Sequence, residues 1–146
     1  MAEYYIPLAI QRKILSLSND YCEYCCYPAA FSPNSFHFDH IIPLIKGGKS
    51  EFENLARACG GCNGFKQDKT HYFDPITHQL CRLYHPREHI WQDFFQWSDD
   101  DLLVVGTNPI GRATVDLLQI NRQANVNLRE LLIMAGLHPP KGLNNK

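Results

Sequence analysis

Residues 37–66 read HFDHIIPLIKGGKSEFENLARACGGCNGFK, and this stretch decides the fold. It contains side chains that bind metal ions or move protons, separated by a Gly-Gly turn at residues 47–48. In chain order these side chains are Asp39, His40, Asn54, Cys59, Cys62 and Asn63. Each residue type is common when taken singly. The inference therefore depends on their joint order and spacing.

Two Cys-x-x-Cys pairs indicate a structural zinc site. The first pair, Cys22 and Cys25, precedes the central stretch, and the second is Cys59 and Cys62. The 33 residues between the pairs (26–58) exceed the usual ~15 to 20 of a zinc ribbon, so we expect a two-stranded unit between them. Four thiolates form a closed tetrahedral Zn²⁺ site without an open position for water. The alternatives are ordinary buried thiols or disulfides, and a cytosolic chain disfavours disulfides.

The adjacent pair Asp39–His40 indicates hydrolytic chemistry. On a strand over residues 36–42 the two side chains point to opposite faces, so they have different tasks. A carboxylate binds Mg²⁺ or Mn²⁺, and an imidazole is a good general base. Asn63 could supply a second metal ligand through its amide oxygen. We expect Asn54 to hydrogen-bond the backbone and hold the strand pair in register.

These motifs together resemble the HNH endonuclease family, in its zinc-knuckle branch. The matching residues are Asp39-His40-Ile41-Ile42-Pro43, Gly47-Gly48, Asn54-Leu55 and Cys59-x-x-Cys62-Asn63-x-x-Lys66. The resemblance implies a ββα-metal fold, with two strands and a helix around one divalent ion, and phosphodiester hydrolysis in DNA, most simply double-stranded. It makes Asp39 and Asn63 the ligands of Mg²⁺ or Mn²⁺, His40 the general base and Asn54 the middle Asn. The last position of the family's motif is often His, whereas here it is Asn63, whose side chain is a neutral amide.

Three further residues are candidates for nucleic-acid binding: His37, Arg57 and Lys66. Two of them, His37 and Lys66, also have an alternative role. His37 could be supporting or exposed, and Lys66 could be a solvated helix charge. Downstream, His85-Pro86-Arg87, residues 91–95, residues 111–114 and Asn121-Arg122 resemble the extension of a bacterial HNH subgroup. The arginines there could line a DNA surface or pair with acids inside the extension.

The pattern of the remaining chain predicts an α+β fold. We expect a helix over residues 6–18, a strand over 80–84, a β-hairpin over 91–97 and 102–105, and helices over 112–122 and 125–135. Gly136 stands at the expected C′ position of the last helix. The predicted organisation is an HNH core with zinc knuckles and the N-terminal helix at 1–72. An extension packed on the core follows at 73–140, and a disordered tail at 141–146.

Composition limits the class of protein and leaves the partner open. Apolar residues make up 45% of the 146 residues, which is enough for a core, and no apolar run reaches the ~18 residues of a membrane span. The N-terminus lacks a secretion-signal pattern, so we expect a cytoplasmic location. A net charge of −1 neither supports nor excludes DNA binding, and the oligomeric state stays open. The competing function is a zinc-stabilised module that binds nucleic acid or protein without cutting.

Overall fold

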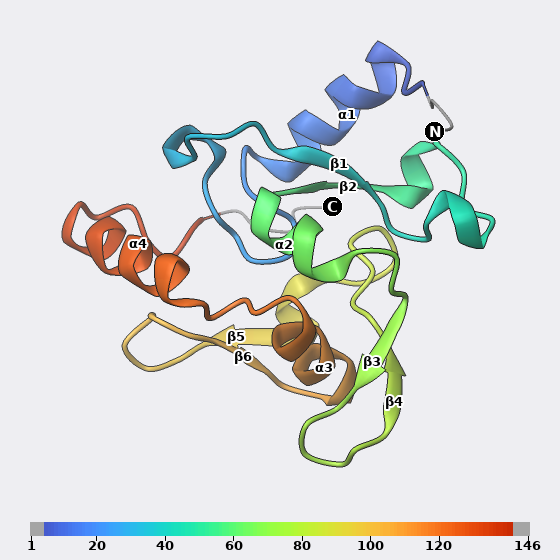
Figure 1. The fold of residues 1–146 in the computed structure, drawn as a ribbon. Helices are drawn as coiled ribbons and strands as arrows, with labels where there is room; N and C mark the ends of the chain where they lie inside the picture. The colour runs from blue at the N-terminus through green and yellow to red at the C-terminus, as the bar shows by residue number, and fades with distance from the viewer. Residues whose placement is uncertain (1–4, 142–146) are drawn as a thin grey trace.

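A computed structural model describes residues 5–141, and its architecture is the mixed α+β fold that the sequence predicts (Figure 1). The expected tail at 141–146 lies outside the described residues except for Lys141. The helices are α1 (Leu8–Ser18), α2 (Gly60–Lys66), α3 (Pro109–Leu117) and α4 (Gln123–Met134). The strands are β1 (His37–His40), β2 (Leu55–Ala58), β3 (His71–Phe73), β4 (Leu80–Arg82), β5 (Phe95–Trp97) and β6 (Val104–Gly106). They form three two-stranded antiparallel sheets, β1–β2, β3–β4 and β5–β6.

The central stretch folds into a ββα unit. Strands β1 and β2 pair in the register Asp39↔Ala56 and His40↔Leu55, so the acid and the imidazole alternate between the two faces of the hairpin. Helix α2 lies against one face and α1 against the other (Figure 1). Cys59 caps the N-terminus of α2, because its sulfur accepts a hydrogen bond from the backbone N–H of Cys62.

The turn between β1 and β2 is closed by a side chain. Asn54 Oδ1 accepts from the backbone N–H of Ile42 at 2.8 Å, and Asn54 Nδ2 donates to the carbonyls of Ile42 and Lys49 at 2.9 and 3.0 Å. The sequence assigned this role to Asn54. Gly48 packs so closely that a Cβ atom there would lie 1.7 Å from the Ile42 carbonyl oxygen. Only glycine fits at that position.

Helix α1 forms a small core with the outer face of the hairpin. Ile6 and Ile14 are buried beside Leu55, with Phe38 and Phe52 packed around them. The helix begins at Leu8 rather than at residue 6, because Pro7 takes the N-cap position with a non-helical backbone. The apolar spacing that predicted this helix is therefore also the face that it buries.

A larger core joins the ββα unit to the C-terminal half of the chain. The zinc-knuckle residues and Tyr24 belong to one buried cluster with Tyr84, Trp91, Phe95 and Leu118. The indole N–H of Trp91 donates to the carbonyl of Tyr24 at 3.0 Å. Hydrophobic packing is therefore continuous across residue 72, where the sequence suggested a division into core and extension. That division stays a prediction.

The C-terminal half departs from the predicted elements at three places. A 3₁₀ turn occupies Trp91–Asp93, so only Phe95–Trp97 of the predicted strand pairs with β6. Helix α3 begins at Pro109 because Asn108 caps it, its side chain accepting from Gly111 N–H at 2.8 Å. The predicted strand at 80–84 pairs with β3, a strand that was not predicted from the sequence. No helix within residues 5–141 is long and apolar enough to cross a membrane.

Candidate functional site

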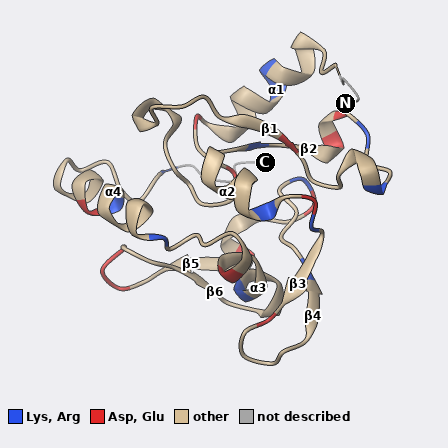
Figure 2. Ribbon diagram, viewed as in Figure 1, with Lys and Arg blue, Asp and Glu red and all other residues tan. Residues whose placement is uncertain are grey.

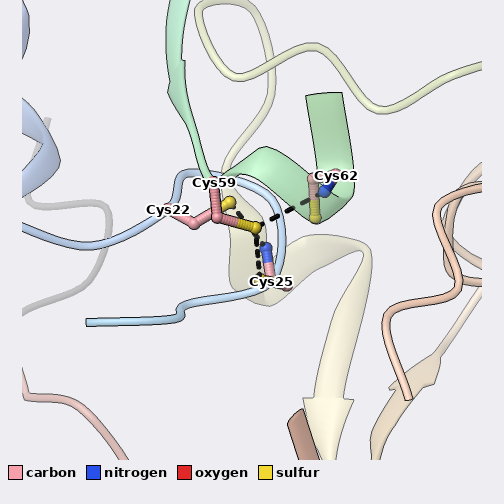
Figure 3. Close-up of side chains that lie close together, drawn as sticks. All are labelled: Cys22, Cys25, Cys59 and Cys62. Atoms are coloured by element: carbon pink, nitrogen blue, oxygen red, sulfur yellow. Dashed lines mark hydrogen bonds between the residues drawn. The ribbon is translucent and has the colours of Figure 1, made fainter. Parts of the chain in front are cut away.

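Four cysteines from the two knuckles converge on one point (Figure 3). All four are buried, and their sulfur atoms lie within 4.8 Å of one another, with Cys25 and Cys59 sulfurs 3.6 Å apart. A tetrahedral zinc ion with bonds of about 2.3 Å separates its sulfur ligands by about 3.8 Å. The donor set and its spacing therefore fit zinc. Within the part of the chain that the structure describes, this is the one group of three or more such ligands found together.

The other two cysteines lie outside this cluster. Cys26 is buried in the main core, and Cys81 is half-buried on β4. All six cysteines are free thiols, which agrees with metal ligation rather than disulfide formation. Burial raises the pKa of Cys22, whereas hydrogen bonds from the neighbouring thiols lower the pKa of Cys59.

Asp39 and His40 line the same cavity, of about 320 Å³, although their side chains leave opposite faces of β1. His37 and Asn63 also line it, so four predicted site residues meet there. Asp68, which the sequence reasoning missed, contributes a second carboxylate. It follows α2 and has no motif of its own, so only the fold brings it to Asp39.

The Asp39 carboxylate is buried and held by two partners. Tyr24 donates its hydroxyl to Oδ2 at 2.8 Å, and the ammonium of Lys66 lies 3.2 Å from the same oxygen. Burial raises the pKa of Asp39, while Lys66 and Tyr24 favour the charged form and oppose that effect. Tyr24 stands between two ligand cysteines in the sequence. The zinc knuckle therefore also positions this acid.

His40 has a different environment from Asp39. Its Nε2 is 2.8 Å from the hydroxyl of Ser50, which orients the ring across the turn. Burial lowers the pKa of His40, opposed by Asp39, so the neutral imidazole prevails near pH 7. A neutral imidazole can accept a proton from water.

Lys66 is buried and points into the protein. Besides Asp39, its ammonium donates to the carbonyls of His40 and Ile41 at 3.1 and 3.0 Å. These internal acceptors explain why the side chain turns inward. Lys66 is therefore not a solvated helix charge, and the phosphate contact stays a prediction. Lys66 instead ties the end of α2 to β1.

Arg57 lies away from the cavity, whereas His37 is exposed on its rim. The Arg57 guanidinium lies 5.4 Å from the ring centre of Phe36 and 3.9 Å from Asp20. Its Nε is buried and has no hydrogen-bond partner among the described residues. Of the three predicted nucleic-acid contacts, the fold therefore brings only His37 to the cavity.

The downstream arginines bind inside the protein. Arg87 forms two hydrogen bonds with the carboxylate of Glu23 in the first knuckle, at 2.6 and 2.8 Å. Arg112 pairs in the same manner with the buried Asp74, at 2.8 Å for each bond. Of the two roles that the sequence left open, pairing with an acid inside the extension is observed for Arg112, whereas the acid that binds Arg87 lies in the first knuckle. Figure 2 shows basic and acidic residues interspersed along the whole chain.

Arg122 contacts the cysteine cluster directly, a feature that the sequence did not reveal. Its Nη2 lies 3.2 Å from the sulfur of Cys59. Burial acts to lower the pKa of Arg122, but the sulfurs of Cys62, Cys25 and Cys59 outweigh it and raise that pKa. The spacing of the four cysteines gives no sign of a fifth participant more than fifty residues downstream.

Residues 22–69 match the model of one protein family, described as HNH endonuclease. The matched segment begins at the first knuckle cysteine and ends three residues after the buried Lys66, so it contains both cysteine pairs and the ββα unit. No curated protein matches the chain.

Proposed function

We propose that residues 22–69, which match the HNH endonuclease family model, form an HNH domain, and that the chain is a metal-dependent endonuclease acting on double-stranded DNA. The observation that carries the proposal is the shared cavity, in which Asp39, His40 and Asn63 meet with His37 on the rim. A pure binding module has no need for an acid, a base and an amide oxygen around one opening. A metal-dependent hydrolase uses a base to activate water and oxygen ligands to hold its ion.

In this proposal, His40 is the general base. As the oxygen of a water molecule forms a bond to phosphorus, its proton passes to the imidazole and one phosphorus–oxygen bond of the DNA backbone breaks. Ser50 holds the ring in place through the 2.8 Å contact to Nε2. Asn54 fixes the turn that carries Ser50, because it bonds the backbone on both sides of that turn.

Asp39 and Asn63 would hold the divalent ion, and Asp68 lines the same cavity. Carboxylate and amide oxygens suit Mg²⁺ or Mn²⁺, which retain several waters when few protein ligands are offered. Such an ion stabilises negative charge on the phosphate and on the leaving oxygen. Tyr24 orients the Asp39 carboxylate by its hydrogen bond.

A plasmid-nicking assay with Mg²⁺ or Mn²⁺ tests the proposal. His40→Ala should lower the cleavage rate ~10² to 10⁴-fold, the usual contribution of a general base. DNA binding should change little, because the zinc cluster and the fold stay intact. His71→Ala is the matched control, since His71 is exposed on β3 and does not line this cavity, and its rate should stay at the wild-type level. Undiminished cleavage by the His40 variant would remove the residue from this role.

One observation favours the second candidate, a zinc-stabilised binding module. The Lys66 ammonium lies 3.2 Å from the Asp39 carboxylate and already provides that acid with a positive charge. A chain that binds duplex DNA, yet nicks no plasmid at any concentration of Mg²⁺ or Mn²⁺, would establish this alternative. Cleavage that disappears on chelation and returns with added metal would exclude it.

A further inference from the structure

Arg122 stands immediately before α4, and its side chain turns back onto the second cysteine pair. Nη2 lies 3.2 Å from the sulfur of Cys59, and Nη1 lies 3.9 Å from the sulfur of Cys62. Both distances are within the range of a hydrogen bond to sulfur. A guanidinium donates several N–H groups in a rigid plane and stays charged at any physiological pH.

The same guanidinium is fixed from the other side by the chain that follows α3. Nη1 donates to the carbonyls of Leu118 and Gln119, at 3.2 and 3.1 Å. These carbonyls stand at the C-terminal end of α3, where backbone oxygens lack helical partners. Arg122 thus connects the cysteine cluster to the segment between the last two helices.

Gly61 makes room for this contact. A Cβ atom at residue 61 would lie 2.4 Å from Nη2 of Arg122 and 2.5 Å from its Cζ. Residue 61 is on the first turn of α2, between the two ligand cysteines, so any larger side chain would displace the guanidinium from the sulfurs. Phe65 of the same helix has its ring centre 5.9 Å from the Arg122 Cζ atom.

The negative charge of a zinc ion bound by four thiolates explains why an arginine is favoured beside the cysteine cluster. Four thiolates around one Zn²⁺ leave a net charge of −2 inside the protein, because all four cysteines are buried. A buried charge without a compensating partner is costly. The guanidinium offsets part of that charge, and its N–H groups bond the sulfurs that water cannot reach.

We propose that Arg122 is the positioning residue of the zinc site, and that it couples zinc binding to the docking of the C-terminal helices. The zinc tetrathiolate attracts the guanidinium, and the guanidinium holds residues 118–122 against α2. Coupling of this kind is reciprocal: the contact of Arg122 strengthens zinc binding by the same factor by which bound zinc strengthens the docking of residues 118–122.

The first measurement is zinc affinity of the full chain, by competition with a chromogenic chelator. Arg122→Met removes the charge and the donors while keeping an apolar stem. Loss of a residue that bonds metal ligands typically lowers metal affinity ~10 to 100-fold, and we expect that range here. Arg122→Lys keeps the charge but not the planar donors, so it should restore part of the loss.

The second measurement is the absorption spectrum of the Co²⁺-substituted chain. Hydrogen bonds to a cysteine sulfur lower the energy of the sulfur lone pairs. Arg122→Met removes these bonds and so reduces the energy needed to transfer an electron from sulfur to cobalt. The sulfur-to-cobalt charge-transfer band should therefore move to longer wavelength. A merely structural arginine would not change that band. Gly61→Ala keeps the arginine but pushes it aside, and should produce the same shift.

Arg129→Met is the matched control. Arg129 is also a buried arginine of the C-terminal segment, but its hydrogen bonds go to oxygens of Leu102, Asn121 and Ile120, at 2.8 to 3.0 Å. This variant should melt at a lower temperature and keep the wild-type cobalt spectrum. Limited proteolysis of the zinc-loaded chain should cleave α4 faster in both arginine variants than in the wild type. The cobalt spectrum therefore separates contact with sulfur from mere support of the C-terminal helices.

Wild-type zinc affinity and an unchanged cobalt band in Arg122→Met would overturn the proposal. An equal band shift in Arg129→Met would overturn it as well, since the effect would then not depend on contact with sulfur. If Arg122→Met does not give folded protein, Arg122→Lys and Gly61→Ala decide the question by the same two measurements.

Discussion

At the scale of single residues, Lys66 shows how much a buried charge depends on its partner. Its ammonium and the Asp39 carboxylate lie 3.2 Å apart, and their side chains are only 1% and 5% exposed. Because both charges have left water, each is stabilised mainly by the other and by the carbonyls and hydroxyl around them. Removing either charge would therefore leave the other one buried without a partner.

Lys66→Met should lower the free energy of unfolding by about 3 to 5 kcal/mol, because it leaves the Asp39 carboxylate buried without its cation. Urea unfolding at pH 7 measures this. Lys46→Met is the control: Lys46 is exposed on the turn after Pro43, so the change should stay within about 0.5 kcal/mol. Equal stability of the two variants would mean that the ion pair contributes nothing to the fold.

His85 should make the stability depend on pH. Its Nδ1 accepts hydrogen bonds from the backbone N–H groups of Arg87 and Glu88, both at 3.2 Å, so a proton there would break two contacts. Burial lowers the pKa of His85 to about 4, although Glu88 opposes the shift. The unfolded chain takes up this proton near pH 6.5, well before the folded chain does.

Stability from the neutral His85 is therefore complete above about pH 6.5 and is lost as the pH falls toward 4, by up to about 3 kcal/mol. Thermal melts at several pH values between 4 and 7 measure the slope. His85→Gln keeps an acceptor that does not titrate, and its stability should fall less steeply over this interval. Parallel slopes for the two chains would contradict the assignment.

At the scale of elements, the sequence predicted those whose signals are local. Both knuckles, helix α1 and the strand that carries Asp39 follow from spacing within about a dozen residues. The pairing of β3 with β4 did not follow, because Asp74 both ends a strand and organises the turn through bonds to Thr77. The strand after this turn, at residues 80–84, was predicted, but its partner β3 before the turn was not.

The candidate site was predictable to the same extent. Motif order identified Asp39, His40, Asn54 and Asn63 as candidates, and the fold brings all but Asn54 to one cavity, with Asn54 on the turn beside it. Tyr24 and Arg122 could not be found in this way. Their partners are 15 and about 60 residues away, and only folding reveals such distances.

At the scale of the whole molecule, the C-terminal half is attached to the ββα unit at chemically different points. Arg87 binds the first knuckle through Glu23, Trp91 bonds the carbonyl of Tyr24, and Arg122 reaches the second knuckle. Both knuckles are thus held from outside the segment that matches the family model. A net charge of −1, with both signs interspersed, means that any attraction to DNA is local rather than a property of the whole surface (Figure 2).

The hydrogen bonds of the Asn54 side chain should make the turn after β1 open only rarely. Ile42 lies beyond the end of β1, yet its N–H is bonded to a side-chain oxygen at 2.8 Å, as it would be to a neighbouring strand. Its deuterium exchange should therefore be as slow as that of the strand amides, and Asn54→Ala should accelerate it to the rate of an open turn. Exchange measured by NMR reports both rates, and rapid exchange at Ile42 in the unaltered chain would contradict this. Slow exchange at Ile42 would mean that the turn beside the proposed catalytic residues rarely opens. Substrate binding would then not require this turn to change conformation.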